Sequence, residues 1–112
     1  MPSTILAVDD SPSMREMIAF LLRSAGYEVV EACDGEQALK IAKSRQLDMI
    51  LTDQNMPKVD GLALVSELRA MSAYRDTPIV ILSTEASAEM KQKGREAGAT
   101  AWISKPFDPD KL

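Results

Sequence analysis

The stretch that decides the fold lies near the amino terminus, at residues 4–12, and reads TILAVDDSP. Its first five residues form a short apolar run of strand length. Serine is favoured just before a helix and proline in its first turn, so Ser11 and Pro12 predict that the strand passes directly into a helix. Apolar residues then follow at helical spacing, at Met14, Met17, Ile18, Leu21, Leu22 and Ala25, and Gly26 stands where this helix should end.

The same alternation of strand and helix continues along the chain. Further strands are predicted at residues 28–32, 49–52, 78–82 and 101–103, and further helices at residues 35–42, 62–68 and 88–97. A last helix is predicted to begin at Asp108-Pro109 and to be truncated, since the sequence stops at Leu112. Strands separated by helices pair in parallel through right-handed crossovers. We therefore expect one α/β domain over residues 1–112, a doubly wound five-stranded parallel sheet with helices on both faces.

Composition excludes several classes of function. The 112 residues include 13 Lys+Arg, 17 Asp+Glu and no histidine, so the formal net charge is −4. Without histidine there is no Ser-His-Asp catalysis and no His-ligated zinc. The acidic balance disfavours direct nucleic-acid binding. The lone Cys33 and the absence of a long apolar span predict a cytoplasmic protein with no membrane insertion, and we expect Cys33 to be a small buried hydrophobe.

Polar side chains follow the predicted strands at the points where they end. Ligands of open parallel sheets bind at the carboxyl ends of the strands, and these ends carry Asp9, Asp10, Asp53, Ser83 and Lys105. Each residue taken alone more often caps the next helix. Three neighbouring carboxylates would repel one another unless a cation lay among them, and ligands that are all oxygen favour Mg²⁺.

The same five residues indicate phosphoryl chemistry. Lys105 is a point charge suited to a phosphoryl oxygen, and Ser83 can donate a hydrogen bond to another. Asp53, at the end of the middle strand, is placed to act as a nucleophile that forms an acyl phosphate. A phosphatase built on an Asp-x-Asp pair is the nearest enzyme alternative, but Asp53-Gln54-Asn55 lacks its second carboxylate.

Five blocks of sequence resemble the receiver domain of two-component response regulators, and among them the CheY-like chemotaxis group. In chain order they are Val8-Asp9-Asp10-Ser11, the stretch from Asp53 to Gly61, Ser83-Thr84-Glu85-Ala86, Gly98-Ala99 and Lys105-Pro106-Phe107. The resemblance covers essentially the whole chain. It implies the flavodoxin-like strand order 2-1-3-4-5, which is known from the family rather than worked out from the sequence.

The resemblance also implies a role for each matched residue. The phosphoacceptor is Asp53, and Mg²⁺ is held by Asp9, Asp10, Asp53 and the backbone carbonyl of Asn55. The switch residues are Ser83 and Trp102, the latter at a position more often tyrosine or phenylalanine. Lys105 matches the family lysine, and Asn55 with Glu85 matches the pair that tunes dephosphorylation.

The implied protein is a signalling switch that catalyses only its own phosphorylation and dephosphorylation. A sensor histidine kinase (CheA-like) would donate the phosphoryl group. The surface formed by the fourth helix, fifth strand and fifth helix would then change its preference for an output protein such as the flagellar motor switch. The alternative is the receiver domain of a longer regulator with a carboxyl-terminal DNA-binding or enzymatic output domain.

Overall fold

The computed structural model describes residues 3–56, 59–84 and 87–104. Its strands are β1 (Thr4–Val8), β2 (Glu28–Ala32), β3 (Met49–Asp53), β4 (Ile79–Ser83) and β5 (Ala101–Ser104). Its helices are α1 (Pro12–Ser24), α2 (Gly35–Ser44), α3 (Gly61–Arg69) and α4 (Ala88–Ala97), with a short 3₁₀ helix at Ser72–Tyr74 that we did not predict. The predicted helix at Asp108-Pro109 lies outside the described residues.

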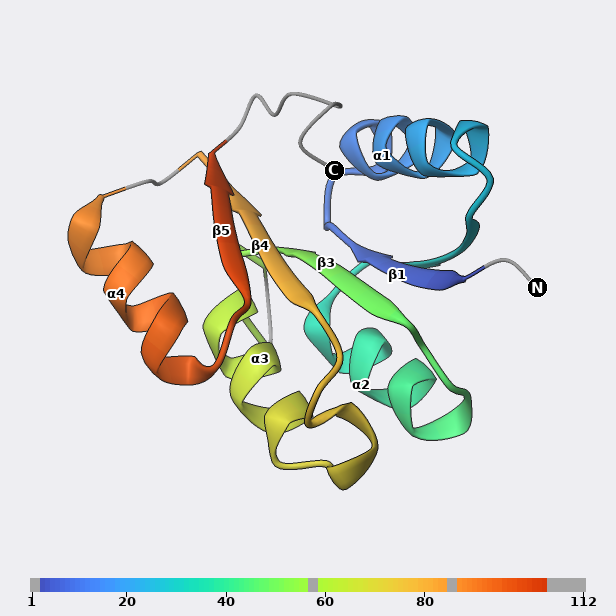
Figure 1. Ribbon diagram of the computed structural model, residues 1–112. Coiled ribbons are helices and arrows are strands. Elements are labelled where there is room, and N and C mark those ends of the chain that lie inside the picture. The colour runs from blue at the N-terminus through green and yellow to red at the C-terminus, as the bar shows by residue number, and fades with distance from the viewer. Residues whose placement is uncertain (1–2, 57–58, 85–86, 105–112) are drawn as a thin grey trace.

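The five strands form one parallel sheet in the order β2-β1-β3-β4-β5, which confirms the expected fold class. Each helix after a strand crosses over the sheet and returns the chain to its starting edge, so all carboxyl ends of the strands lie together (Figure 1). In the register, Val8 of β1 pairs with Thr52 of β3. The next residues along these strands, Asp9 and Asp53, therefore lie side by side at the carboxyl edge of the sheet.

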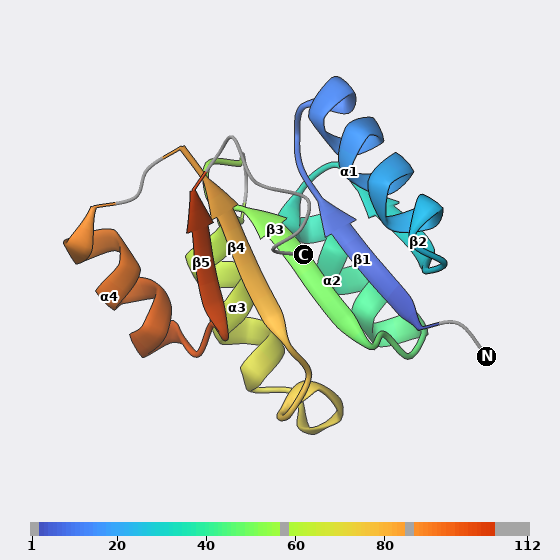
Figure 2. The ribbon, with the colours of Figure 1, turned by 45° about the horizontal axis from the view of Figure 1, so that its top comes forward.

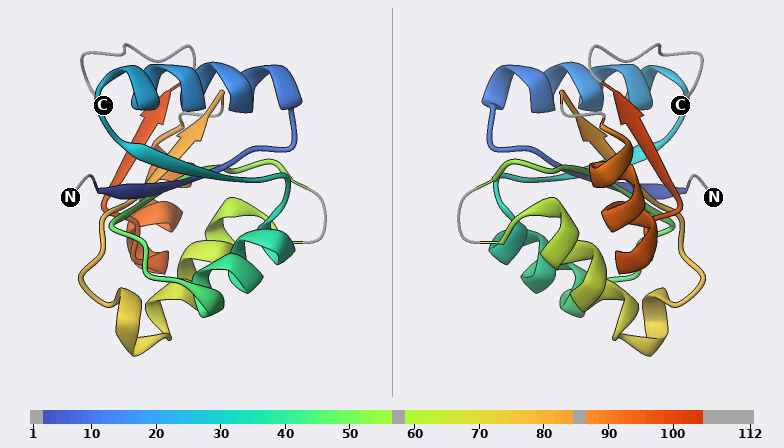
Figure 3. Two further views of the ribbon diagram at one scale, coloured as in Figure 1. Left: turned by 90° about the vertical axis from the view of Figure 1, so that its right-hand side faces the viewer. Right: turned by 90° about the vertical axis from the view of Figure 1, so that its left-hand side faces the viewer.

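The sheet separates two apolar layers. α1 lies on one face, and α2 and α3 lie on the other (Figure 3). The α1 layer buries Ile18, Ala19 and Leu22 against alternate residues of the strands, while the opposite layer is built on Leu64, Val65 and Leu68 of α3 with residues of α2 and the other strand face. α4 flanks β5 at the edge of the sheet (Figure 2).

The buried stripe of α1 differs from the predicted one. Ile18 and Leu22 are buried as expected, but Met17 is 45% exposed and Ala25 is exposed, whereas Ala19 is buried. The helix rests on β1 and β2 through the 18-19-22 stripe, so its packing face is rotated from the face predicted by the apolar spacing. Phe20 projects from the outer side and is 69% exposed.

Arg69 ties the far ends of α3, β4 and β5 together. Its Nε donates to the carbonyl of Gly98, its Nη1 donates to the carbonyls of Tyr74 and Thr77, and its Nη2 donates to the Thr100 hydroxyl. The four donor–acceptor distances lie between 2.6 and 3.2 Å. One side chain thus fixes the turn from α4 into β5.

Candidate functional site

Three carboxylates meet at the carboxyl edge of the sheet. Asp9, Asp10 and Asp53 each offer one oxygen, and these oxygens all lie within 4.8 Å of one another. Asp9 follows β1 directly and is buried, Asp10 is exposed, and Asp53 is the half-buried last residue of β3. The structure therefore brings together the acids that the sequence placed at neighbouring strand ends.

The turn that carries Asp9 is held from three sides. The Asp9 amide donates to the carbonyl of Ala32 at 3.1 Å, and a carboxylate oxygen of Asp9 accepts from the Ser11 amide at 2.9 Å. Arg15, in the first turns of α1, reaches back and donates through Nη1 to the Asp9 carbonyl at 2.7 Å. The peptide that joins Asp9 to Asp10 is thereby fixed, which orients both carboxylates.

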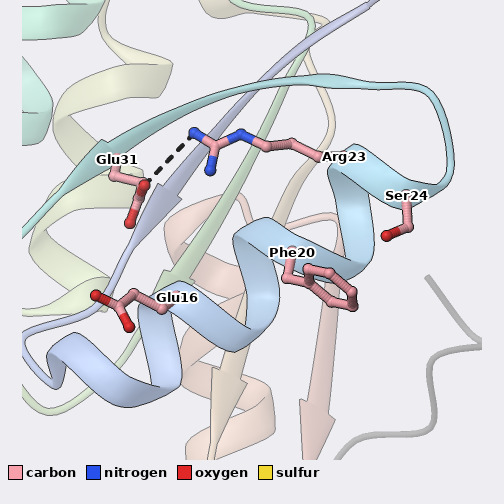
Figure 4. Close-up of a pocket in the computed structure, with 5 residues that line it drawn as sticks. All are labelled: Glu16, Phe20, Arg23, Ser24 and Glu31. Carbon is pink, nitrogen blue, oxygen red and sulfur yellow. Dashed lines mark hydrogen bonds and ion pairs between the residues drawn. The ribbon is translucent and has the colours of Figure 1, made fainter.

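Arg15 is itself oriented by a residue of β2. Its Nε lies 3.4 Å from an oxygen of Glu31, and Nη2 of Arg23 lies 3.5 Å from the other oxygen. Figure 4 shows Arg23 extending from α1 towards Glu31 across a shallow hollow, with Phe20 on the outer side of the helix. Sequence reasoning missed Arg15 and Glu31, because nothing in their spacing indicates that α1 lies over β2.

The other side of the cluster is set by the start of α3. An oxygen of Asp53 accepts from the Gln54 amide at 2.9 Å. The buried Gln54 side chain accepts from the Leu62 amide at 2.9 Å, and the Gly61 amide donates to the Gln54 carbonyl at 3.0 Å. A Cβ at Gly61 would lie 2.6 Å from the Asp53 carbonyl oxygen. Only glycine lets α3 begin this close to Asp53.

The other predicted site residues lie around this edge. Ser83 is fully buried at the end of β4, and Asn55 is exposed two residues after Asp53. Trp102 is half-buried on β5, paired with Ile81 of β4 and packed on the α3 layer. Ser83 and Trp102 follow the same alternation as Ile81 and so belong to that face of the sheet. Lys105 and Glu85 lie outside the described residues.

Cys33 departs from the sequence expectation, because it is exposed. It follows the last residue of β2, Ala32, and so lies past the covered part of the strand. Its amide donates to the Gln37 side chain at 2.6 Å, and its Sγ lies 3.8 Å from a carboxylate oxygen of Asp34. The residue belongs to the turn before α2 rather than to the core.

The acidic cluster fits a hard divalent cation. Its three donors are carboxylate oxygens from three different residues, with neither sulfur nor imidazole among them, and such a set suits Mg²⁺ held with water molecules.

None of the described helices is both long and apolar enough to cross a membrane.

Comparison with known proteins identifies the family. Residues 5–112 match the response regulator receiver domain, and the chain belongs to this family of two-component receiver domains. The chain is 40% identical over 109 residues to the phosphate regulon transcriptional regulatory protein PhoB of Pseudomonas aeruginosa, covering 97% of this chain and 48% of that protein. It spans about half the length, or less, of the first curated relatives that it matches.

Solved structures share the fold. The chemotaxis response regulator CheY4 of Vibrio cholerae is 46% identical with a TM-score of 0.93, over 98% of this chain and 92% of that one. The receiver domain of sensor histidine kinase PA1611 of Pseudomonas aeruginosa is 34% identical with a TM-score of 0.91, over 100% of this chain and 92% of that one. That structure has a magnesium ion coordinated in its active-site cleft.

Proposed function

We propose that Asp53 accepts a phosphoryl group from a phosphohistidine of a sensor histidine kinase, with Mg²⁺ held by Asp9, Asp10, Asp53 and the Asn55 carbonyl. The observation that carries the proposal is the meeting of three carboxylate oxygens within 4.8 Å at the carboxyl edge of the sheet. Three carboxylates this close together do not stabilise the fold, because they repel one another and any incoming phosphate unless a cation is present.

Asp53 is the nucleophile because its carboxylate ends the middle strand. As the P–N bond of the phosphohistidine breaks, a P–O bond forms to a carboxylate oxygen of Asp53, and the released imidazole nitrogen takes up a proton. When bound, Mg²⁺ neutralises charge on the phosphoryl oxygens. Asp9 and Asp10 bind the ion, Ser83 donates a hydrogen bond to one phosphoryl oxygen, and Lys105 neutralises another.

The phosphorylated state is read out through Ser83 and Trp102. Both residues belong to the α4 side of the sheet, and α4 has Gly94 as its one buried residue. A helix held by so little burial moves at low cost, which suits a switch surface made of α4, β5 and the fifth helix. Water then attacks the acyl phosphate, and Asn55 and Glu85 tune that step.

A role in chemotaxis, with a CheA-like kinase and the flagellar motor switch as output, is the function we favour. Similarity to CheY4 over nearly the full length of both chains supports it. The second candidate is the receiver part of a longer transcriptional regulator, which similarity to PhoB supports. Retention of the phosphorylated protein by a flagellar switch protein would favour the first, and phosphorylation-dependent DNA binding by the whole protein the second.

The test is incubation with acetyl phosphate and Mg²⁺, followed by intact-mass measurement. We expect one phosphoryl adduct that is lost in Asp53→Asn and retained in Asp76→Asn, which changes the net charge equally on an exposed loop residue. The adduct should fail to form when Mg²⁺ is removed by a chelator. An adduct that survives Asp53→Asn would refute Asp53 as the acceptor.

A further inference from the structure

Gly94 is a glycine that the backbone of α4 does not require. Glycine inside a helix destabilises it by about 1 kcal/mol relative to alanine. Among the described glycines, positive φ angles occur at Gly26 and Gly98 and not at Gly94. Gly94 lies in the interior of α4 and is buried. Its cost to the helix therefore calls for an explanation in what surrounds it.

The space next to Gly94 is filled by the indole ring of Trp102. A Cβ built at position 94 would lie 2.8 Å from Cε3 and 3.3 Å from Cζ3 of that ring, and 3.8 Å from Cδ1 of Ile81. Real Cβ atoms essentially never come closer than 3.0 Å to such a neighbour. Any side chain at position 94 must therefore move the ring, the helix or both.

The surroundings of the ring show where it could go if a side chain were placed at position 94. The indole is rigid and is carried by the edge strand β5, where Trp102 pairs with Ile81 of β4. A hollow between α4 and β5 runs beside the ring and is lined by Lys91, Arg95 and Ala101 as well as by Gly94 and Trp102. This hollow is open space beside the ring, which gives the ring room to move aside when a side chain is placed at position 94.

We propose that Gly94 is a positioning residue for Trp102: the missing side chain holds a place for the indole against α4, and the residue at position 94 sets how far the ring turns towards the interior. The coupling between position 94 and the Trp102 ring is inferred from their contact alone. Its consequence for signalling rests on the proposed function, in which Trp102 is part of the switch.

The first test uses Trp102 as its own reporter, because it is the one tryptophan of the chain. In Gly94→Ala we expect emission at longer wavelength and stronger quenching by acrylamide, since the ring is pushed towards solvent. Gln92→Ala, an exposed change on the same helix, should leave both unchanged. Unaltered emission and quenching in Gly94→Ala would overturn the proposal.

A mutant cycle separates this contact from helix propensity. On propensity alone, Gly94→Ala should lower the equilibrium constant for unfolding by about five-fold. We expect this roughly five-fold gain in stability to be absent in the wild-type background. It should appear in a Trp102→Ala background, where no ring meets the new methyl group. The same five-fold gain in both backgrounds would show that the ring and position 94 are not coupled.

The link to signalling is measured with acetyl phosphate and Mg²⁺. We expect Gly94→Ala to form the Asp53 adduct in full by intact mass, but to show an altered change in Trp102 emission on phosphorylation. A normal adduct with a wild-type emission change would refute the signalling consequence. Failure of the wild-type protein to form the adduct would instead refute the proposed function, and the cycle above would still decide the pairing.

Discussion

Removing one carboxylate from the acidic cluster should make the metal-free protein more stable. Asp10 is the residue to change, because its side chain is exposed and accepts no hydrogen bond within the described part of the chain, so Asp10→Asn removes charge and little else. Asp9 and Asp53 offer oxygens within 4.8 Å of it. At that separation two charges repel by about 0.9 kcal/mol in water and about 3.5 kcal/mol at an effective dielectric constant of 20.

The expected gain is smaller than the sum of both repulsions. Asp9 and Asp10 are sequence neighbours and repel in the unfolded chain as well, which cancels part of the effect. We therefore expect Asp10→Asn to raise the free energy of unfolding by about 1–2 kcal/mol without metal, or the Tm by about 5 °C or more. High salt should shrink the difference, since the site is partly open to solvent.

Saturating Mg²⁺ should reverse the order of stability. A ligand at 100 times its Kd stabilises the folded state by about 2.7 kcal/mol, and Asp10→Asn should lose most of that gain. Thermal melts of both proteins with chelator and with Mg²⁺ provide the measurement, and Asp76→Asn is the control for net charge. A metal-free Asp10→Asn that melts at or below the wild-type temperature would refute the repulsion argument, and equal stabilisation of both by Mg²⁺ would refute the metal site.

Three further changes test the supports of the site and fold. Arg15→Met frees the Asp9 carbonyl and should weaken Mg²⁺ binding about ten-fold by calorimetry, and unchanged affinity would show that Asp9 is oriented without it. Tyr74→Phe removes a buried hydroxyl that donates to the Ala42 carbonyl and should cost about 1–3 kcal/mol in urea melts. Burial raises the pKa of Tyr74 above its ordinary 10.0. The wild type should therefore lose this stability as the pH rises through and above about 10, and Tyr74→Phe should not. Parallel pH profiles of stability for the two proteins would contradict this. Arg69→Met loses several hydrogen bonds to backbone carbonyls and should cost at least about 3 kcal/mol, whereas a loss below 1 kcal/mol would mean that water replaces them.

The positions of the strands were predictable because short apolar runs mark them and polar or turn residues mark their ends. The runs that became β1 and β3 are largely apolar and contain β-branched residues, and an aspartate stands at or directly after the end of each. Once they are paired in parallel, their carboxyl ends must meet. That rule was enough to bring Asp9, Asp10 and Asp53 together. The roles assigned to these residues came from the family resemblance, and phosphorylation remains the test of them.

Side-chain contacts across elements were not predictable in the same way. The rotation of α1 that leaves Met17 exposed and buries Ala19 depends on how the helix rests on β2, and apolar spacing alone does not fix that angle. Arg15 has no local pattern that pairs it with Glu31. Gly94 looks like an ordinary weak point in a helix until the ring of Trp102 is placed against it.

The hydrogen bonds of Arg69 determine how α4 can move. Gly98 directly follows the helix, and its carbonyl accepts a hydrogen bond from Nε of Arg69 at 2.8 Å. Any tilt of α4 should therefore turn about its carboxyl end. A ten-residue helix is about 15 Å long, and a tilt of about 10° about this pivot would carry the opposite end, near Ser87, through about 2.6 Å. The ring of Trp102 contacts α4 at Gly94, near the middle of the helix. A small displacement of α4 at this contact therefore becomes a larger displacement at its amino-terminal end, which lies towards the acidic cluster.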